Sequence, residues 1–115
     1  MAGRARAKAR GYRVERKIKL MFEASGWKTV RAGASLGEAD LVCLKAGRCI
    51  LVQVKSTKKK ALYYYGYMKD RLEDFPFYIV ADFGYGKVRI LHPKKKVTVE
   101  NGELFEEFLE RHPEI

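Results

Sequence analysis

The sequence predicts one α/β domain built on a central mixed β-sheet flanked by helices. Three patterns predict this fold class: helical spacing of apolar residues over 12–25, two runs rich in Val, Leu and Ile within 40–55, and a second helical pattern over 103–111. No internal repeat or linker separates them, so helix, sheet and helix belong to one layered unit. A chain of 115 residues is long enough to bury one core and too short for two.

Each predicted element has its own signal in the sequence. The first helix carries one apolar stripe, formed by Val14, Ile18, Met21 and Phe22, and Gly26 ends it. Strands are favoured where Val, Ile, Thr and aromatic residues cluster between Gly, Pro and Asp. They are expected at residues 27–31, 40–45, 48–55, 77–82, 87–91 and 97–99, with a short helix within 62–74 and a closing helix at 103–111.

The charge of the chain is strongly one-sided. Lys and Arg number 24 against 14 Asp and Glu, a net charge of +10, which exceeds what solubility requires and is typical of polyanion binders. Residues 1–10 alternate small and basic side chains, so we expect a flexible basic arm ahead of a folded domain at 11–115. No apolar run is long enough to span a bilayer and no secretory signal is present, so we expect a cytoplasmic protein without a membrane partner.

A predicted hairpin within residues 40–55 brings polar side chains together. A turn at residues 46–47 pairs Leu41 with Val52 and places Asp40 opposite Gln53. Because side chains alternate along a strand, Gln53 and Lys55 share the face of Asp40, and the apolar residues between them point to the other face. Polar groups at the end of an apolar sheet either reach solvent or bind something.

Asp40, Gln53 and Lys55 suit a hydrolase that uses a hard cation. A carboxylate and an amide carbonyl offer the oxygen ligands that Mg²⁺ prefers, and the ion lowers the pKa of a water that can attack a phosphodiester. Lys55 can orient that water or stabilise charge in the transition state. Glu15, at the edge of the first helix's buried stripe, can reach over the sheet end as a further ligand. The alternatives are ordinary ion pairs, Asp40 with Lys55 and Glu15 with Lys19.

These residues lie within four longer segments of the first half of the chain. The segments are Gly11-Tyr12-Arg13-Val14-Glu15-Arg16-Lys17-Ile18, Arg31-Ala32-Gly33-Ala34-Ser35, Asp40-Leu41-Val42 and Ile50-Leu51-Val52-Gln53-Val54-Lys55-Ser56. In this order and spacing they resemble the archaeal Holliday junction resolvases, within the wider group of PD-(D/E)-x-K nucleases. The resemblance implies a restriction-endonuclease-like fold.

The resemblance also implies roles for single residues. Glu15, Asp40 and Gln53 would bind Mg²⁺ or Mn²⁺, Lys55 would assist the attacking water, and Ser35 would act near the scissile phosphate. The family pattern further implies a homodimer that cuts two opposed strands of a four-way DNA junction. Gln53 stands where the family usually has glutamate, which removes one negative charge from the metal site. A noncatalytic module that binds structured DNA, and a general or RNA-processing nuclease of the same fold, stay open as alternatives.

Basic residues outside the catalytic set are predicted to contact DNA phosphates. The tyrosine-rich segment 63–67 is expected to pack or to contribute to an interface, with base stacking as the alternative. The predicted DNA-contacting residues are Arg4, Arg6, Lys8, Arg10, Arg13, Arg31, Lys58, Lys59 and Lys60.

Overall fold

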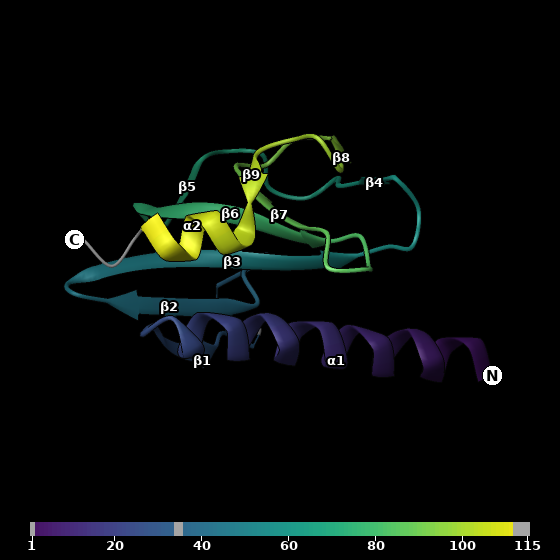
Figure 1. Cartoon of the computed structure of the whole chain (residues 1–115), viewed down its shortest axis with the longest axis horizontal. Helices are drawn as coiled ribbons and strands as arrows, with labels where there is room; N and C mark the ends of the chain where they lie inside the picture. The colour runs from purple at the N-terminus through teal and green to yellow at the C-terminus, as the bar shows by residue number, and fades with distance from the viewer. Residues whose placement is uncertain (1, 34–35, 112–115) are drawn as a thin grey trace.

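The computed structural model describes residues 2–33 and 36–111, with side chains from residue 11 onward. The six predicted strands correspond to β1, β2, β3, β6, β7 and β8, and the two terminal helices to α1 and α2 (Figure 1). In chain order the elements are α1 (Ala2–Ala24), β1 (Lys28–Arg31), β2 (Leu41–Lys45), β3 (Arg48–Ser56), β4 (Ala61–Tyr63), β5 (Arg71–Leu72), β6 (Phe75–Asp82), β7 (Val88–Leu91), β8 (Lys96–Thr98), β9 (Glu103–Leu104) and α2 (Phe105–Arg111).

Strand pairing makes a mixed sheet, as the sequence predicts. The strand order is β1-β2-β3-β6-β7-β9, and β5 pairs with the beginning of β6. The central neighbours β3 and β6 run parallel, from Leu51 opposite Phe77 to Ser56 opposite Asp82. The other pairs among the described strands are antiparallel. The long strand β3 therefore lies at the centre of the sheet, with a neighbouring strand on each side.

Both helices pack against the same face of the sheet. Phe22 of α1 and Phe105 of α2 are fully buried there with Val52 of β3, and the two phenyl rings lie 5.0 Å apart. The opposite face is covered in part by the two-stranded sheet β4–β8, which lies across the central strands from α1 (Figure 1). The α/β fold class is confirmed, with its helices on one face. None of the described helices is long and apolar enough to cross a membrane.

Residues 62–74 do not form the short helix that was expected there. Side chains alternate instead, because Leu62 and Tyr64 are buried whereas Tyr63 and Tyr65 are exposed. Burial that alternates with every residue, in a segment of aromatic residues that favour strands, is typical of an extended strand and explains β4. The segment then continues through β5 into β6 and so supplies the crossover between the parallel strands β3 and β6.

The β2–β3 hairpin has the predicted register. Leu41 pairs with Val52, and the turn residues Ala46 and Gly47 have φ angles of 50° and 80°. Two-residue hairpin turns require this left-handed conformation because it matches the twist of the flanking strands. Glycine adopts it freely, whereas Ala46 does so at a steric cost. The turn thus fixes which residues of β2 and β3 are neighbours at the far end of the hairpin.

Helix α1 begins at Ala2, well before the predicted start at residue 12. Ala, Arg and Lys are strong helix formers, so an alternation of small and basic residues supports a helix as readily as an open coil. In Figure 1 the N-terminal part of α1 projects beyond the sheet. The flexibility of residues 1–10 stays a prediction.

Candidate active site

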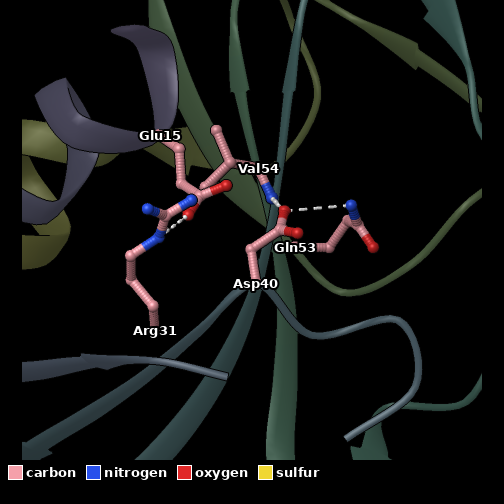
Figure 2. A network of polar contacts seen from close by, with 5 residues as sticks. All are labelled: Glu15, Arg31, Asp40, Gln53 and Val54. Atoms are coloured by element: carbon pink, nitrogen blue, oxygen red, sulfur yellow. Dashed lines mark hydrogen bonds and ion pairs between the residues drawn. The ribbon is translucent and has the colours of Figure 1, made fainter. Parts of the chain in front are cut away.

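The far end of the β2–β3 hairpin holds Asp40. Its backbone N–H donates to the carbonyl of Val52 over 2.7 Å, which continues the strand ladder one residue ahead of β2. Its carboxylate oxygen Oδ2 accepts hydrogen bonds from the Val54 N–H over 2.7 Å and from Gln53 Nε2 over 3.0 Å (Figure 2). Asp40 and Gln53 are therefore direct neighbours, as the predicted register requires.

Glu15 reaches the same place from helix α1, whose buried stripe docks it on the sheet. Its Oε1 accepts a hydrogen bond from Arg31 Nε over 2.7 Å, and this salt bridge joins α1 to β1. The alternative pairing of Glu15 with Lys19 is wrong, because Lys19 pairs with Glu23. Figure 2 shows the carboxylate of Glu15 beside that of Asp40.

The pKa of Asp40 is raised above its ordinary value. Burial of the carboxylate is the main cause, the hydrogen bond from the Val54 N–H opposes it, and the negative charge of Glu15 adds to it. Lys55 lowers the same pKa and Glu38 raises it, both to a smaller extent. Two carboxylates are thus held close together in a half-buried place, where a bound cation relieves both their repulsion and their desolvation.

Lys55 belongs to the same face of β3 as Gln53. It lies beside Ala81 of β6, whose side chain packs on the face covered by β4–β8. No ion pair among the described residues joins Lys55 to Asp40. The alternative of an ordinary salt bridge between them is therefore not supported, and Lys55 acts on Asp40 through its charge alone.

A pocket of about 240 Å³ opens over the side chains of Glu15, Asp40 and Gln53. Its carboxylate and amide oxygens are the hard ligands that suit Mg²⁺ or Mn²⁺, and such a donor set leaves places in an octahedral shell for water and phosphate oxygens. Among the residues described, no cluster of three or more His, Cys, Asp or Glu side chains could hold a metal ion. The residues that line the pocket are Gly11, Tyr12, Glu15, Asp40, Gln53 and Val54.

Gln53 presents its amide nitrogen, not its carbonyl oxygen, to Asp40. The side chain is buried, being 8% exposed. Because the carbonyl oxygen is the atom of an amide that binds metals, Gln53 can coordinate an ion bound to Oδ2 of Asp40 only after a half-turn of the amide. That rotation breaks the hydrogen bond to Asp40, so the two interactions exclude each other.

Glu38 and Tyr64 are residues of the site that sequence reasoning missed. Burial and then the charge of Glu38 raise the pKa of Tyr64 to about 12, and the charge of Asp40 contributes as well. A Cβ atom at Gly66 would lie 2.5 Å from the Tyr64 hydroxyl oxygen and 2.7 Å from Glu38 Oε2, so any larger residue at this position would have to displace one or both of these side chains. No sequence signal pointed to this contact, because it joins segments on either side of the β2–β3 hairpin.

The residues predicted to contact DNA, together with Ser35, which was predicted to act near the scissile phosphate, fall into three groups. Arg13 and residues 58–60 are exposed. Arg31 is also exposed but pairs with Glu15, and its guanidinium carbon lies 5.1 Å from the ring centroid of Tyr12. Ser35 and the side chains of Arg4, Arg6, Lys8 and Arg10 lie outside the described residues, although the backbone of these four basic residues belongs to α1.

The structure resembles that of Archaeoglobus fulgidus Hjc, a Holliday junction resolvase from an archaeal hyperthermophile, with a TM-score of 0.66 and 19% sequence identity. The match covers 88% of this chain and 96% of that one, and at this identity it shows the fold. Curated protein sequences give no match. A model of the archaeal Holliday junction resolvase (Hjc) family matches residues 6–104, so the chain belongs to this family of nucleases that resolve four-way DNA junctions.

Proposed function

We propose that this chain is an endonuclease that hydrolyses DNA phosphodiesters at four-way junctions with Mg²⁺ or Mn²⁺. The observation that carries the proposal is the convergence of Glu15 from α1, Asp40 from just before β2 and Gln53 from β3 on one pocket. The net charge of +10 supports a polyanionic substrate, and membership of the resolvase family supports the junction. Since the substrate is DNA, we expect the protein in the cytoplasm.

Each residue of the predicted catalytic set has its own proposed role. Asp40 and Glu15 supply the negative charge that holds the ion, and Gln53 supplies a carbonyl oxygen once its amide turns. The ion, when bound, lowers the pKa of a water and polarises the phosphate. Lys55 donates a hydrogen bond to the attacking water and offsets the charge that grows on the phosphate oxygens. Ser35, shortly before Asp40 in the sequence, is proposed to contact the scissile phosphate.

Basic residues on two elements offer phosphate contacts around this pocket. The N-terminal part of α1 and the loop between β3 and β4 lie toward the same end of the molecule (Figure 1). That loop carries residues 58–60, and Arg13 is exposed on α1 near the pocket residues Gly11 and Tyr12. We propose that these groups bind the phosphates of the junction arms, with Arg31 holding Glu15 in place through their salt bridge.

The active form is proposed to be a homodimer. A four-way junction is nearly two-fold symmetric, and two opposed cuts need two active sites, which a dimer with two-fold symmetry supplies. Met68 and Phe75 are exposed apolar side chains that flank β5, and we propose that they contribute to the interface. A monomer seen by light scattering at micromolar concentration, with paired cleavage of junctions intact, would contradict the dimer.

The experiment that tests the activity compares labelled four-way junctions with fully paired duplex. The purified protein is incubated with each substrate in Mg²⁺, in Mn²⁺ and in chelator. Paired nicks in opposed strands of the junction, and none in chelator, are expected. Equal cutting of every substrate would show a general nuclease instead, and uncut junctions in both metals would refute the proposal. Cleavage of an RNA junction of the same design, with the DNA junction left uncut, would identify an RNA-processing nuclease.

A noncatalytic module that binds structured DNA is the second candidate, and one contact favours it. The Gln53 amide satisfies part of the hydrogen-bonding need of Asp40, so this carboxylate does not depend on a cation alone. Calorimetry separates the two candidates. The nuclease should take up Mg²⁺ or Mn²⁺ and lose that uptake in Asp40→Asn, whereas the module should show no specific uptake and bind junctions with a steep salt dependence.

A further inference from the structure

Two tyrosines, Tyr63 at the end of β4 and Tyr65 just after it, lie side by side on the outer side of this segment. Tyr63 is 56% exposed and Tyr65 is 72% exposed. Their ring centroids lie 6.4 Å apart and their planes differ by 11°. The arrangement follows from the extended backbone, in which alternate residues point to the same side. The two rings therefore form a preformed aromatic surface in contact with water.

The hydrophobic core does not explain these two side chains. Tyr64, between them, points the other way and is buried with Leu62 and Val97 against the central sheet. That inward set already docks β4–β8 on the sheet. Tyr63 and Tyr65 consequently add little to the packing, and their rings are accessible to a ligand.

Lysines surround the tyrosine pair. Lys96 lies opposite Tyr63 across the two strands, and Lys95 Nζ lies 5.6 Å from the ring centroid of Tyr65. Neither strand β4 nor strand β8 contains an acidic side chain, and the segments that precede both strands are rich in lysine, while Glu100 follows β8. The exposed lysines of these segments are Lys58, Lys59 and Lys60 before β4, and Lys94, Lys95 and Lys96 before and at the start of β8.

We propose that Tyr63 and Tyr65 form a stacking site for unpaired bases of a DNA strand, with the surrounding lysines on its phosphates. Flat ring faces for any base, joined to cationic groups for the backbone, are the combination by which proteins bind single strands without sequence preference. A second copy of this chain that bound at this surface would bring like charges together, so self-association is a less favourable use of the surface than DNA binding. The proposal rests on the proposed function in one respect, namely that DNA is the substrate.

The position of the stacking site relates it to the active site. Tyr64, in the same segment, lies close enough to Glu38 and Asp40 for their charges to raise its pKa. Strand β3, which carries Gln53, leads directly into the lysine-rich loop before β4. The segment that carries the tyrosine pair is therefore joined to the active site through the buried Tyr64, whereas the rings of Tyr63 and Tyr65 lie on its outer side.

The test measures binding of a labelled oligothymidylate and of an abasic oligomer of equal length, both to the full chain in chelator. Wild type should bind the oligothymidylate roughly tenfold more tightly than the abasic oligomer. A double Tyr63→Ala, Tyr65→Ala variant should lose this preference and keep its affinity for the abasic oligomer. A double Tyr63→Phe, Tyr65→Phe variant keeps the ring faces and should keep the preference.

Two single variants complete the design. Tyr85→Ala removes a tyrosine that is 95% exposed in the turn between β6 and β7, so it should bind both oligomers as wild type does. Lys95→Gln should weaken binding of both oligomers to a similar extent, because it removes a phosphate contact and leaves the rings. Circular dichroism melts establish that each variant is folded.

Equal affinity of wild type for the two oligomers overturns the proposal, and so does a preference that survives in the double alanine variant. Light scattering tests the other occupant. If the double alanine variant dissociates a dimer while base preference is unchanged, the surface is an interface between copies and the stacking site is refuted. None of these binding assays depends on cleavage. Failure of the proposed function would appear as uncut junctions in Mg²⁺, whereas failure of the stacking site would appear as a loss of base preference in chelator.

Discussion

The side-chain amide of Gln53 donates a hydrogen bond to Oδ2 of Asp40 over 3.0 Å. This neutral donor stands where the resemblance to resolvases predicts a second carboxylate, and it stabilises the ionised form of Asp40. A cation that binds both Oδ2 of Asp40 and the Gln53 carbonyl must first displace this hydrogen bond. We therefore expect weak metal binding before DNA adds its phosphate oxygens to the site.

Gln53→Glu should cleave junctions at lower Mg²⁺ concentration than wild type. The added carboxylate attracts the dication without the amide rotation that Gln53 requires. In chelator the same carboxylate repels Asp40 and raises the pKa of Asp40 further, so the variant should melt at a lower temperature. Single-turnover cleavage across a Mg²⁺ titration, and thermal melts in chelator, measure the two effects.

The control for this prediction is Gln53→Ala, which supplies neither the amide nor a carboxylate. It should need more Mg²⁺ than wild type for the same rate. If Gln53→Ala instead cuts at the wild-type rate throughout the titration, Gln53 is not a ligand and its role is confined to the hydrogen bond with Asp40.

Asp40→Asn should lower cleavage at least about a hundredfold and stabilise the protein at neutral pH. Because the folded state raises the pKa of Asp40, mainly through burial, its ionisation costs free energy of folding once the pH exceeds 3.8, the ordinary value. Asparagine avoids that cost. The gain in melting temperature should be present at neutral pH and disappear below pH 3.8, where Asp40 is protonated in both states.

Thermal melts of wild type and Asp40→Asn in chelator, from acid to neutral pH, measure this gain. Glu38→Gln is the matched control, because Glu38 is exposed and has a smaller effect on the pKa of Asp40 than burial or Glu15. It should shift the melting temperature less. A variant Asp40→Asn that melts below wild type at neutral pH would show that the carboxylate's hydrogen bonds outweigh its desolvation.

The sequence was sufficient to predict the contact between Asp40 and Gln53, because the register of a hairpin is local. Counting outward from the turn at residues 46–47 pairs residues close in the chain, and alternation then assigns Lys55 to the same face. The boundary position of Glu15 followed in the same way from helical periodicity. Its partner Arg31 was predicted only as a DNA contact, because the salt bridge depends on how α1 docks beside β1.

Contacts that depend on tertiary packing could not be predicted. Glu38 and Tyr64 meet only because β4–β8 folds over the sheet face that the helices leave free. The extended conformation of β4 was missed for a related reason. Its burial alternates over very few residues, and its partner β8 lies far along the chain, so no local pattern distinguished it from a short helix.

Lys55→Ala should lower the cleavage rate strongly and move the acid limb of the pH profile to higher pH. Lys55 lowers the pKa of Asp40, so its removal leaves that pKa higher still and Asp40 loses its charge at a higher pH. Single-turnover rates across a pH series at saturating Mg²⁺ measure the shift. Lys59→Ala, in the exposed loop after β3, should weaken binding and leave the pH profile unchanged. If the pH profile of Lys55→Ala is not shifted, the charge of Lys55 does not control the ionisation of Asp40 in the reaction.

Replacing the basic side chains of the N-terminal part of α1 by glutamine should weaken junction binding without changing cleavage at saturating protein. Each lost phosphate contact lowers the slope of log affinity against log salt by about 0.9, so the slope should fall by up to roughly 3 to 4. Glutamine favours the helix nearly as well as Arg and Lys, so the change removes charge and keeps α1. The residues replaced are Arg4, Arg6, Lys8 and Arg10.

A variant that lacks residues 2–10 extends this test, because it removes the helix segment as well as the charge. If the segment only contacts phosphates, the deletion and the glutamine variant should show the same salt slope and the wild-type single-turnover rate. The pocket residues that α1 supplies begin at Gly11, so the deletion leaves Glu15 and its salt bridge with Arg31 in the chain. Loss of single-turnover cleavage at saturating protein in the deletion, but not in the glutamine variant, would mean that the first turns of α1 hold Glu15 over Asp40.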